Sequence, residues 1–483
     1  MNIRKTKVIC TLGPAVDSEE MIRKLILSGM NCARFNFSHG THESHLETLN
    51  RLRRVRDELG RPVAAMLDTK GPEIRIKSFE NGPIELKPGD EFILTTWDMP
   101  GNEHKVSVTY ENLHNEVAPG TRILIDDGLI ELTVNHIEGQ DIHCVVVSGG
   151  PLSNNKSINI PGAKIQLPSL TDKDREDLRF AAENDFDFVA ASFIRKAQDI
   201  YDIRAELAKW GGDRIRVIAK IENQEGVDNF DEILAASDGT MVAPGDLGVE
   251  IPAYEVPKLQ KDMIAKSAAA GKNVITATQM LDSMIRNPRP TRAEVSDVAN
   301  AVYDGTSCVM LSGETASGKY PIEALEIMVK TVTAAENSIN YWDRFQREYE
   351  LDREVGSQLI DQAICHTCCI TAMDLSTSAI LAATTSGHTA RMISRFRPAC
   401  PILGLTTSEK VRRQLAISWG VVPLLYGSVD STDRLFSLCV DTARKEGYIN
   451  VGDRVVITAG VPLSVARTTN LMKVQVVEQP LPL

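Results

Sequence analysis

Eight short apolar runs rich in β-forming residues recur along the first two thirds of the chain, and this repetition is what most constrains the fold. The runs span 8–14, 31–37, 63–69, 186–193, 216–221, 240–243, 273–278 and 306–311. Seven of them lead directly into a helical pattern, as at 18–28, 41–59, 197–210 and 321–338. Nearly continuous apolar strands that alternate with helices favour a closed parallel barrel over an open sheet. We therefore predict a (β/α)8 TIM barrel.

The third run is the exception, because a region with different patterning follows it. From about 71 to 168 the sequence alternates polar and apolar residues in short runs separated by turn sequences such as Asp127-Gly128. The strands predicted there span 84–86, 91–94, 122–125, 129–134 and 142–147. This pattern indicates an inserted all-β domain, a small β-barrel lid over the mouth of the larger barrel. A hinged cap of this kind excludes water from a reactive phosphoryl group.

A third unit follows the barrel, after a charged connector that begins near residue 340. Its predicted strands span 379–385, 402–406, 421–425, 454–459 and 473–477, and helices separate them. The predicted domains are 1–70 with 169–340, 71–168 and 341–483. A chain of 483 residues is too long for one ordinary core, which agrees with this division.

Composition limits the kinds of partner. The net charge of −12 argues against non-specific binding to nucleic acid or to anionic membranes. Any anionic ligand must therefore be held by a local basic pocket. The N-terminus lacks the apolar core of a signal peptide, and no apolar run is long enough to cross a membrane, so we expect a cytoplasmic protein.

The cysteines do not suggest metal or redox chemistry. There are nine, and Cys365 and Cys368 form a C-x-x-C pattern that encloses His366. Because no second ligand pair follows at the spacing of a zinc site, we interpret these residues as buried thiols on a helix.

Polar residues follow two neighbouring strands in the stretch 217–248. Lys220 and Glu222 lie at the end of one run, and Asp246 follows the next. Carboxyl ends of parallel strands meet at one mouth, so these side chains are expected to converge. Two carboxylates suit Mg²⁺ or Mn²⁺, and a lysine suits a phosphoryl or enolate oxygen that gains negative charge. A surface ion pair between Lys220 and Glu222 is the alternative, and this spacing alone does not decide between the two.

The other strand ends add cations, carboxylates and hydroxyls. They carry Arg34 to Gly40 on the second run, Asp68 to Arg75 on the third, Thr276 and Thr278 on the seventh, and Ser312 to Glu314 on the eighth. One polar residue at one strand end is unremarkable, but here nearly every end carries several. The combination favours a metal-assisted site for a phosphorylated carboxylic acid.

Several longer segments amount to a family resemblance. ARFNFSHGTHE, LDTKGPEIR, KIENQEG, MVAPGDLGVEIP, ATQMLDSMIRNPRPTRAE and MLSGETASGKYP resemble the signature segments of the pyruvate kinase family. The similarity runs through essentially the whole chain and is to the bacterial three-domain type without an extra C-terminal extension. It implies transfer of a phosphoryl group from phosphoenolpyruvate to ADP, giving pyruvate and ATP in the last step of glycolysis. It also implies a cytoplasmic homotetramer with allosteric control.

The resemblance implies roles for residues at the mouth. Glu222 and Asp246 would hold Mg²⁺ or Mn²⁺, while Lys220 and Arg34 would stabilise the transferring phosphoryl group. The substrate carboxylate would be received by the backbone at Gly245 and Asp246 together with Thr278. Thr278 would also lie on the route that protonates the enolate.

Two further residue sets follow from the same resemblance. The predicted K⁺ site consists of Asn36, Ser38, Asp68 and Thr69, a set of hard oxygen ligands. Glu73 matches the K⁺-dependent type, because K⁺-independent members carry a lysine there. The predicted nucleotide contacts are Pro14, Asn36, His39, Arg75 and Lys156, the last reaching in from the inserted domain.

Two positions depart from the family pattern. Pro244 stands where arginine is usual, which removes a charge near a subunit contact but leaves the metal ligand. Ser44 lacks the aromatic ring that some members place near the nucleotide. We expect looser packing around adenine.

A glycine and several hydroxyls precede a helix predicted at 390–396 in the C-terminal domain. The loop consists of Thr384, Thr385, Ser386, Gly387, His388 and Thr389. Such a loop binds anions through free backbone N–H groups, although an ordinary helix cap has the same composition. It is similar to the family's effector-phosphate loop.

The expected effector is a monophosphate. Glu446 falls where relatives activated by fructose 1,6-bisphosphate place a basic residue, and Arg467 falls where glycine is common. An acid would repel a second phosphate. The hypothesis is that AMP or a sugar monophosphate activates in preference to the bisphosphate.

Two other function classes share part of this pattern. A Mg²⁺-dependent aldolase acting on pyruvate uses a similar barrel, but it needs neither the lid nor the C-terminal phosphate loop. An inactive paralogue that only senses phosphosugars should have lost at least one catalytic residue, and none is missing.

Overall fold

The computed structural model describes residues 3–163, 165–346, 359–463 and 468–478. Eight parallel strands close into a barrel in the order β1-β17-β16-β15-β14-β13-β3-β2. They are β1 (Lys7–Leu12), β2 (Cys32–Asn36), β3 (Ala64–Asp68), β13 (Phe188–Ala191), β14 (Arg216–Ile221), β15 (Gly239–Val242), β16 (Asn273–Thr276) and β17 (Cys308–Leu311). Each lies within or next to one of the eight predicted runs, so the closed barrel is confirmed.

Helices cover the outside of the barrel and bury their apolar faces against the strands. They are α1 (Glu19–Ser28), α2 (His42–Glu58), α4 (Asp172–Glu183), α5 (Ala197–Lys209), α6 (Gln224–Asp228), α7 (Phe230–Ala236), α8 (Pro244–Glu250), α9 (Val256–Ala269), η1 (Asp282–Ile285), α10 (Arg292–Asp304), α11 (Gly313–Ala316) and α12 (Pro321–Asn337). Capping boxes fix the starts of α2, α4 and α10, at Thr41, Thr171 and Thr291. The helix that belongs to β3 is α4, which begins only after the insertion.

The inserted region has its own hydrophobic core and is all-β apart from the short helix α3 (Leu113–Glu116). Its main sheet has seven strands in the order β4-β12-β8-β9-β10-β6-β7, and β11 pairs with β5 separately. The strands are β4 (Ile74–Arg75), β5 (Ile84–Leu86), β6 (Glu91–Thr95), β7 (Lys105–Ser107), β8 (Arg122–Ile125), β9 (Ile130–Glu138), β10 (Asp141–Ser148), β11 (Gly150–Leu152) and β12 (Ser157–Asn159). An isolated bridge between Ile76 and Val108 joins the ends of the edge strands β4 and β7, so the sheet curls back on itself.

The C-terminal region is a five-stranded sheet between two apolar clusters. Its strands, in the order β20-β19-β18-β21-β22, are β20 (Val421–Leu425), β19 (Ile402–Thr406), β18 (Ala379–Ala383), β21 (Arg454–Gly460) and β22 (Thr469–Val476), the last antiparallel to β21. Its helices are α14 (Ile360–Asp374), α15 (His388–Arg395), α16 (Glu409–Leu415) and α17 (Thr432–Lys445). Cys365 and Cys368 lie fully buried on α14 and all nine cysteines are free thiols, which confirms the interpretation of the C-x-x-C pattern.

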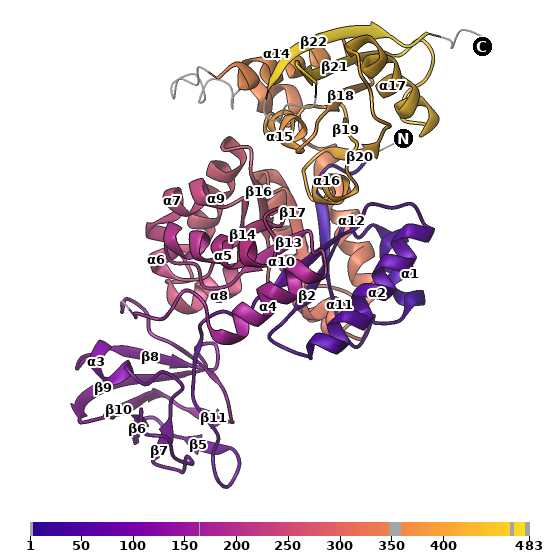
Figure 1. Ribbon diagram of the computed structural model, residues 1–483. Coiled ribbons are helices and arrows are strands. Elements are labelled where there is room, and N and C mark those ends of the chain that lie inside the picture. Colours follow the sequence, from indigo (N-terminus) through magenta and orange to yellow (C-terminus); the bar gives the residue numbers. More distant parts are fainter. Residues whose placement is uncertain (1–2, 164, 347–358, 464–467, 479–483) are drawn as a thin grey trace.

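The inserted and C-terminal regions lie at opposite ends of the barrel (Figure 1). The insertion leaves the carboxyl end of β3, and the C-terminal region covers the amino ends of the strands. There Ile417 joins the small apolar cluster inside the barrel, and Lys7 Nζ donates to the Val421 carbonyl at 2.7 Å. The mouth at the carboxyl ends therefore faces the lid, and the other end is closed by the C-terminal region. The boundaries 70/71, 168/169 and 340/341 stay predictions.

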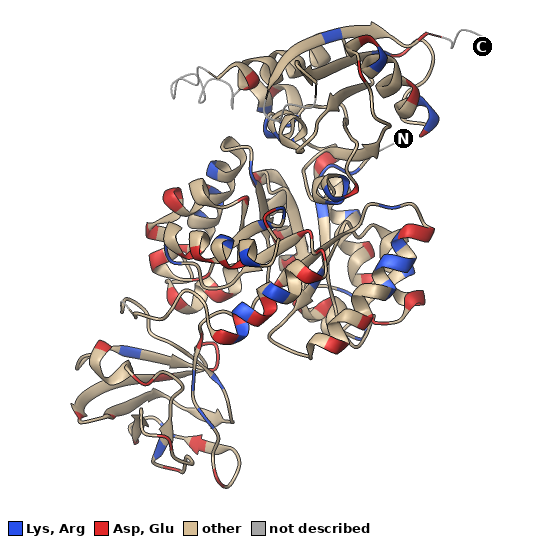
Figure 2. Cartoon of the chain, viewed as in Figure 1, with Lys and Arg blue, Asp and Glu red and all other residues tan. Residues whose placement is uncertain are grey.

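Charged residues of both signs are mixed along the surface helices. Lys and Arg alternate with Asp and Glu along α4, for example (Figure 2). Among the described residues, no helix is both long and apolar enough to cross a membrane.

Candidate active site

A network of buried charges joins four strands at the carboxyl mouth of the barrel. Lys220, on β14, lies with Nζ 3.2 Å from Asp68 Oδ1 and 2.9 Å from Glu222 Oε1. The same ammonium donates to Ser192 Oγ at 2.8 Å, and Ser192 directly follows β13. All of these side chains are buried. The pair of Lys220 and Glu222 is therefore an internal ion pair, and the alternative of a surface pair is wrong.

Arg34 completes the network from β2. Its Nε donates to Asp68 Oδ2 at 2.5 Å, and its Nη1 donates to Thr11 Oγ1 at 3.0 Å. Burial alone would raise the pKa of Asp68, but the charges of Arg34 and Lys220 outweigh it and lower that pKa. Burial would likewise lower the pKa of Lys220, but Asp68 and Glu222 outweigh it and raise that pKa. Asp68 and Lys220 are thus both charged at neutral pH.

Of the two predicted metal ligands, Glu222 belongs to this network and Asp246 stands outside it. It lies in the first turn of α8, and within the described residues its carboxylate has no hydrogen-bond or ion-pair partner. Shielding by the surrounding protein and, second, the negative charge of Glu222 raise the pKa of Asp246 to about 7. The side chain still meets solvent at the mouth, so a ligand can reach it.

This donor set fits a divalent cation. The negative charges of Glu222 and Asp246 repel each other at the partly shielded mouth. A hard cation bound between the two carboxylates removes this repulsion. Glu222 Oε2 accepts from the Phe193 backbone N–H at 2.8 Å, which fixes the orientation of that carboxylate. The chemistry of these residues therefore agrees with the predicted Mg²⁺ or Mn²⁺ ligands.

Thr278 and Gly245 meet beside Asp246. The Thr278 hydroxyl accepts a hydrogen bond from the Gly245 N–H at 3.0 Å. Thr278 and Gln279 have φ values of 63° and 53°, in the left-handed region that non-glycine residues rarely adopt. Such strained backbone is concentrated at functional sites, where the surrounding structure holds it. The structure thus brings together Gly245, Asp246 and Thr278, as predicted for a carboxylate subsite.

The residues predicted to hold K⁺ also lie together. Asn36 ends β2 and is the register partner of Asp68 at the end of β3. Its Oδ1 accepts from the Ser38 backbone N–H at 3.2 Å, and Thr69 follows Asp68 directly. Their carboxylate, amide, hydroxyl and carbonyl oxygens are hard donors of the kind that K⁺ requires, so the donor chemistry fits.

The predicted nucleotide contacts come from both sides of the mouth. Pro14 and His39 lie exposed on the loops after β1 and β2. Arg75 lies on β4 and forms an ion pair with Glu73 at 2.6 Å, while Lys156 pairs with Asp126 at 2.9 Å. Both cations are thus held by acidic partners within or next to the lid.

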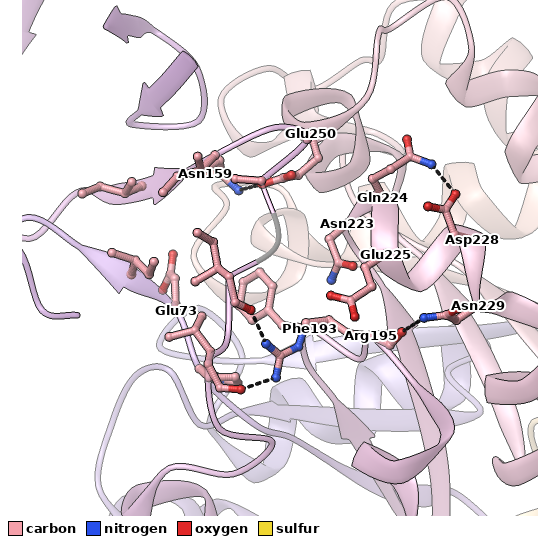
Figure 3. Close-up of a pocket in the computed structure, with 18 residues that line it drawn as sticks. Glu73, Asn159, Phe193, Arg195, Asn223, Gln224, Glu225, Asp228, Asn229 and Glu250 are labelled. Atoms are coloured by element: carbon pink, nitrogen blue, oxygen red, sulfur yellow. Dashed lines mark hydrogen bonds between the residues drawn. The ribbon is translucent and has the colours of Figure 1, made fainter. Parts of the chain in front are cut away.

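The lid contacts the barrel directly. Asn159 Nδ2 donates to Glu250 Oε1, on α8, at 2.9 Å. The negative charge of Asp127, on the lid's β8–β9 turn, is close enough to contribute to the raised pKa of Asp246. A cavity of about 380 Å³ lies between lid and barrel, with Glu73 and Phe193 in its wall (Figure 3). The lid therefore borders the mouth in the position that the sequence predicted.

Three residues of the mouth were missed by the sequence interpretation: Thr11, Ser192 and Asp127. Thr11 and Ser192 lie at or just after the first and fourth strands, the two strand ends that the list of polar ends omitted. The same rule applied to all eight runs would have found both. Asp127 lies in a turn that the sequence identified, but only the docking of the lid brings it near Asp246.

The predicted effector loop faces two different cavities. Thr384, Thr385 and Thr389 line a cavity of about 140 Å³ in the C-terminal region, walled mainly by hydroxyl and apolar groups. His388 lines another cavity, next to the barrel. The Ser386 carbonyl also faces the barrel, where it accepts from Arg216 Nη2 at 3.2 Å.

The departures from the family pattern have local structural explanations. Pro244 is the first residue of α8, where proline's fixed φ suits a helix start. Ser44 forms the capping box of α2 with Thr41. Glu446 is exposed at the end of α17 and does not line the effector-loop cavity, so any effect on a second phosphate would act at longer range. Arg467 lies outside the described residues.

Known proteins resemble this chain over nearly its whole length. Residues 3–325 match the family model described as pyruvate kinase, barrel domain, and residues 362–475 match pyruvate kinase, alpha/beta domain. A pyruvate kinase from Clostridium acetobutylicum is 50% identical over 477 residues, which cover 99% of this chain and 100% of that protein. One from Geobacillus stearothermophilus is 48% identical, over 98% of this chain and 80% of its own length.

A solved structure shows the same architecture. The crystal structure of a pyruvate kinase from Cryptosporidium parvum superimposes with a TM-score of 0.93 at 40% identity, covering 98% of this chain and 96% of that one. The fold similarity therefore includes the barrel, the insertion and the C-terminal region together.

Proposed function

Because the chain belongs to the pyruvate kinase family, its activity is that of a pyruvate kinase, and we propose that the barrel mouth performs this reaction with Mg²⁺ and K⁺. The bond between phosphorus and the enol oxygen of phosphoenolpyruvate breaks, and the phosphorus forms a bond to a terminal oxygen of ADP. The enolate that is left takes up a proton at carbon to become pyruvate, and ATP is the second product. The observation that carries the proposal is the network of Lys220, Arg34, Asp68 and Glu222 beside the unpaired Asp246.

Lys220 and Arg34 stabilise the transferring group. Phosphoryl transfer needs positioning and charge neutralisation more than covalent help from the protein. Both cations are buried and fixed by Asp68, so they need little reorganisation when negative charge develops on the phosphoryl and enolate oxygens. Asp68 therefore acts as the residue that positions both cations.

Glu222 and Asp246 hold the divalent cation. Mg²⁺ or Mn²⁺, when bound there, supplies positive charge that offsets the oxygens of the substrate. The carboxylate of Asp246 supports this role, because it meets solvent beside Glu222 and no protein group among the described residues competes with a cation for its oxygens.

The substrate carboxylate binds at Gly245, Asp246 and Thr278. The bond from Gly245 N–H to Thr278 Oγ1 supports this assignment, because it orients the hydroxyl beside the metal ligands. Thr278 then lies on the path by which the enolate takes up its proton.

Asn36, Ser38, Asp68 and Thr69 hold K⁺, and Glu73 makes the enzyme depend on it. Glu73 has a raised pKa, mainly because it is buried, and its partner is Arg75. No lysine charge replaces the monovalent cation at this position.

The nucleotide binds between barrel and lid, with Pro14, Asn36, His39, Arg75 and Lys156 around it. Two of these contacts must leave their present partners, since Arg75 pairs with Glu73 and Lys156 with Asp126. Lid movement on nucleotide binding is the natural means for that exchange.

Allosteric activation uses the loop of Thr384, Thr385, Ser386, Gly387, His388 and Thr389, and a monophosphate such as AMP or a sugar monophosphate is the activator. The cavity of about 140 Å³ that this loop lines supports a small ligand. Initial rates at subsaturating phosphoenolpyruvate test it: stronger activation by fructose 1,6-bisphosphate than by either monophosphate would contradict it.

The protein acts as a cytoplasmic homotetramer. Nine free cysteines agree with a reducing compartment, in which disulfides are rare. Family membership supports the tetramer, and light scattering of the purified protein measures it; a monomer in the presence of substrates would rule it out.

The proposed use of both cations is tested by the initial rate of pyruvate formation. Wild type should need Mg²⁺ or Mn²⁺ and should lose most of its rate when K⁺ is replaced by a large organic cation. The matched variant Glu73→Lys should keep the divalent requirement but no longer respond to K⁺. Full wild-type activity without K⁺ would remove the K⁺ site and leave the enzyme assignment intact.

A further inference from the structure

A second polar cavity lies where the C-terminal region meets the amino ends of the barrel strands. Its volume is about 390 Å³, similar to that of the cavity beside the mouth. Barrel residues and α15 residues both line it. The charged and ionisable ones are Arg204, Arg216, Asp238, Lys272, His388 and Arg391.

Positive charge dominates this cavity. Four cationic side chains and one carboxylate line it, although the chain as a whole carries a net charge of −12. Arg204 Nη2 and Arg216 Nη1 both contact Asp238, each at 2.7 Å, so one acid holds two guanidinium groups in place. The excess cations make the cavity a place where an anion is favoured.

The cavity also touches the effector loop from its opposite side. Arg216 Nη2 and Arg391 Nη1 both donate to the Ser386 carbonyl, at 3.2 and 3.3 Å. Thr384, Thr385 and Thr389 face the other cavity, in the C-terminal region. Two distinct cavities therefore share one loop, and among the described residues only the one beside the barrel is lined by cationic side chains.

We propose that this interdomain cavity binds a small organic phosphate monoester, at a site separate from the effector-loop cavity. Arginine is the side chain best suited to phosphate, since its planar fork donates two parallel hydrogen bonds. Arg216 and Arg391 approach from different regions of the molecule, so a dianionic phosphate can bridge them. The volume exceeds what bare phosphate needs and leaves room for a sugar or nucleoside portion.

Binding here is linked to the catalytic mouth through β14. Arg216 is the first residue of that strand, and Lys220 lies near its carboxyl end. A phosphate that draws Arg216 and Arg391 away from the Ser386 carbonyl changes the contacts between the effector loop and this strand. The cavity is thus positioned to alter the coupling between the C-terminal region and the barrel.

Equilibrium binding of AMP to the full-length protein tests the proposal, with inorganic phosphate as a second probe. Thr385→Glu places a negative charge in the effector-loop cavity, so of the two cavities that share the loop only the interdomain one should bind phosphate in that background. We expect the Thr385→Glu variant to bind AMP. Inorganic phosphate should bind to the same variant at least tenfold more weakly than AMP does. Phosphate binding as tight as AMP would identify a simple anion site and overturn the monoester assignment.

Two further changes in the same background locate the site. Adding Arg391→Gln should weaken AMP binding at least tenfold, while Arg395→Gln, on the same helix but outside the cavity, should leave it unchanged. Loss of all AMP binding in Thr385→Glu alone, or equal affinity with and without Arg391→Gln, would overturn the proposal. Full activation by AMP in Thr385→Glu would instead count against the effector-loop assignment and leave the interdomain site standing.

A measurement on the unmutated chain covers the case in which Arg391→Gln fails to fold. Phenylglyoxal modifies arginine side chains, and mass spectrometry reports the extent at each one. AMP should slow modification of Arg391 and Arg216 several-fold and leave Arg395 unaffected. Equal rates at Arg391 with and without AMP would contradict the proposal.

Discussion

The two ends of the barrel use the same residue types in different ways. At the amino end, Asp238 accepts from Arg204 and Arg216 side chains and from the Val217 N–H at 3.0 Å. At the carboxyl mouth, Asp246 has no partner among the described residues, although Lys220 and Arg34 lie near enough to influence it. The carboxylate of Asp238 is thus fully paired, whereas that of Asp246 is left without a partner in the described part of the chain.

The pKa values express the same difference. Burial alone would raise the pKa of Asp238, but Arg216 and Arg204 outweigh it and the pKa is lowered. The pKa of Asp246 is raised to about 7. Removing the partner of a buried carboxylate destabilises the fold, whereas a carboxylate without a partner is retained where a ligand supplies the missing charge. Incomplete pairing, more than burial itself, therefore distinguishes the reactive end.

The largest effect should come from removing the central cation of the mouth. Lys220→Met should lower kcat by about 10³-fold, the loss expected when a preorganised charge at the reacting group is removed. The control is Lys410→Met at the amino end, where Lys410 pairs with Asp185 at 2.6 Å. Its kcat should stay within a factor of two of wild type, roughly the range of an uninvolved site. A similar loss in both variants would break the comparison.

Breaking a pair at the amino end should instead affect stability. Arg413 Nε donates to both oxygens of Asp187, at 2.9 and 3.1 Å, and joins the C-terminal region to the barrel. Arg413→Met leaves Asp187 buried without its cation and should cost about 3 kcal/mol of stability. Denaturant unfolding measures the cost, and kcat of the folded fraction should change little. An unchanged unfolding midpoint would show that this end does not depend on the pair.

A smaller effect, from removing the Ser192 hydroxyl, should show whether this side chain positions Lys220 or only packs against its neighbours. Ser192 Oγ receives a hydrogen bond from Lys220 and donates to the Thr69 carbonyl at 2.6 Å. Ser192→Ala should lower kcat about tenfold, equivalent to about 1.4 kcal/mol, with KM nearly unchanged. Ser267→Ala is the matched control, because its buried hydroxyl pairs with Thr240 at 2.8 Å away from the mouth. Equal kcat in the two variants would assign Ser192 a purely structural role.

The smallest effect concerns pH at the amino end. Asp238 has a lowered pKa in the fold, so its stabilising contribution is fully present above the unfolded value near 3.9 and is lost as pH falls through the folded value. Asp238→Asn should therefore have a lower Tm than wild type at pH 7, and the gap should narrow as the pH falls below about 4. Thermal unfolding from pH 7 to pH 3 measures it. A Tm difference between the two proteins that widens on acidification would contradict the predicted direction of this effect.

Sequence patterns predicted the barrel and the core of its mouth because both depend on local rules. Alternation of apolar strands with helices defines the barrel, and the strand-end rule found Lys220, Glu222 and Asp68. Contacts between regions were beyond that reasoning, because docking of separate units decides them. The insertion of Ile417 into the barrel and the approach of Asp127 to Asp246 are of this kind.

The effector loop shows the same limit. Its composition indicates an anion site, and the resemblance agrees. Only the docking of the C-terminal region shows that His388 lines a cationic cavity beside the barrel while Thr384 and Thr385 line another. A one-dimensional pattern does not separate the two sides of a loop.

The most direct test of the central claim is Mn²⁺ binding, measured by electron paramagnetic resonance of the free ion. If the unpaired carboxylate at the mouth awaits a cation, wild type with phosphoenolpyruvate should take up Mn²⁺, and Asp246→Asn should bind it about 100-fold more weakly, a loss of the size expected for a metal ligand or its close support. The control Asp238→Asn, at the paired end, should bind as wild type does. Equal Mn²⁺ affinity in wild type and Asp246→Asn would contradict the account.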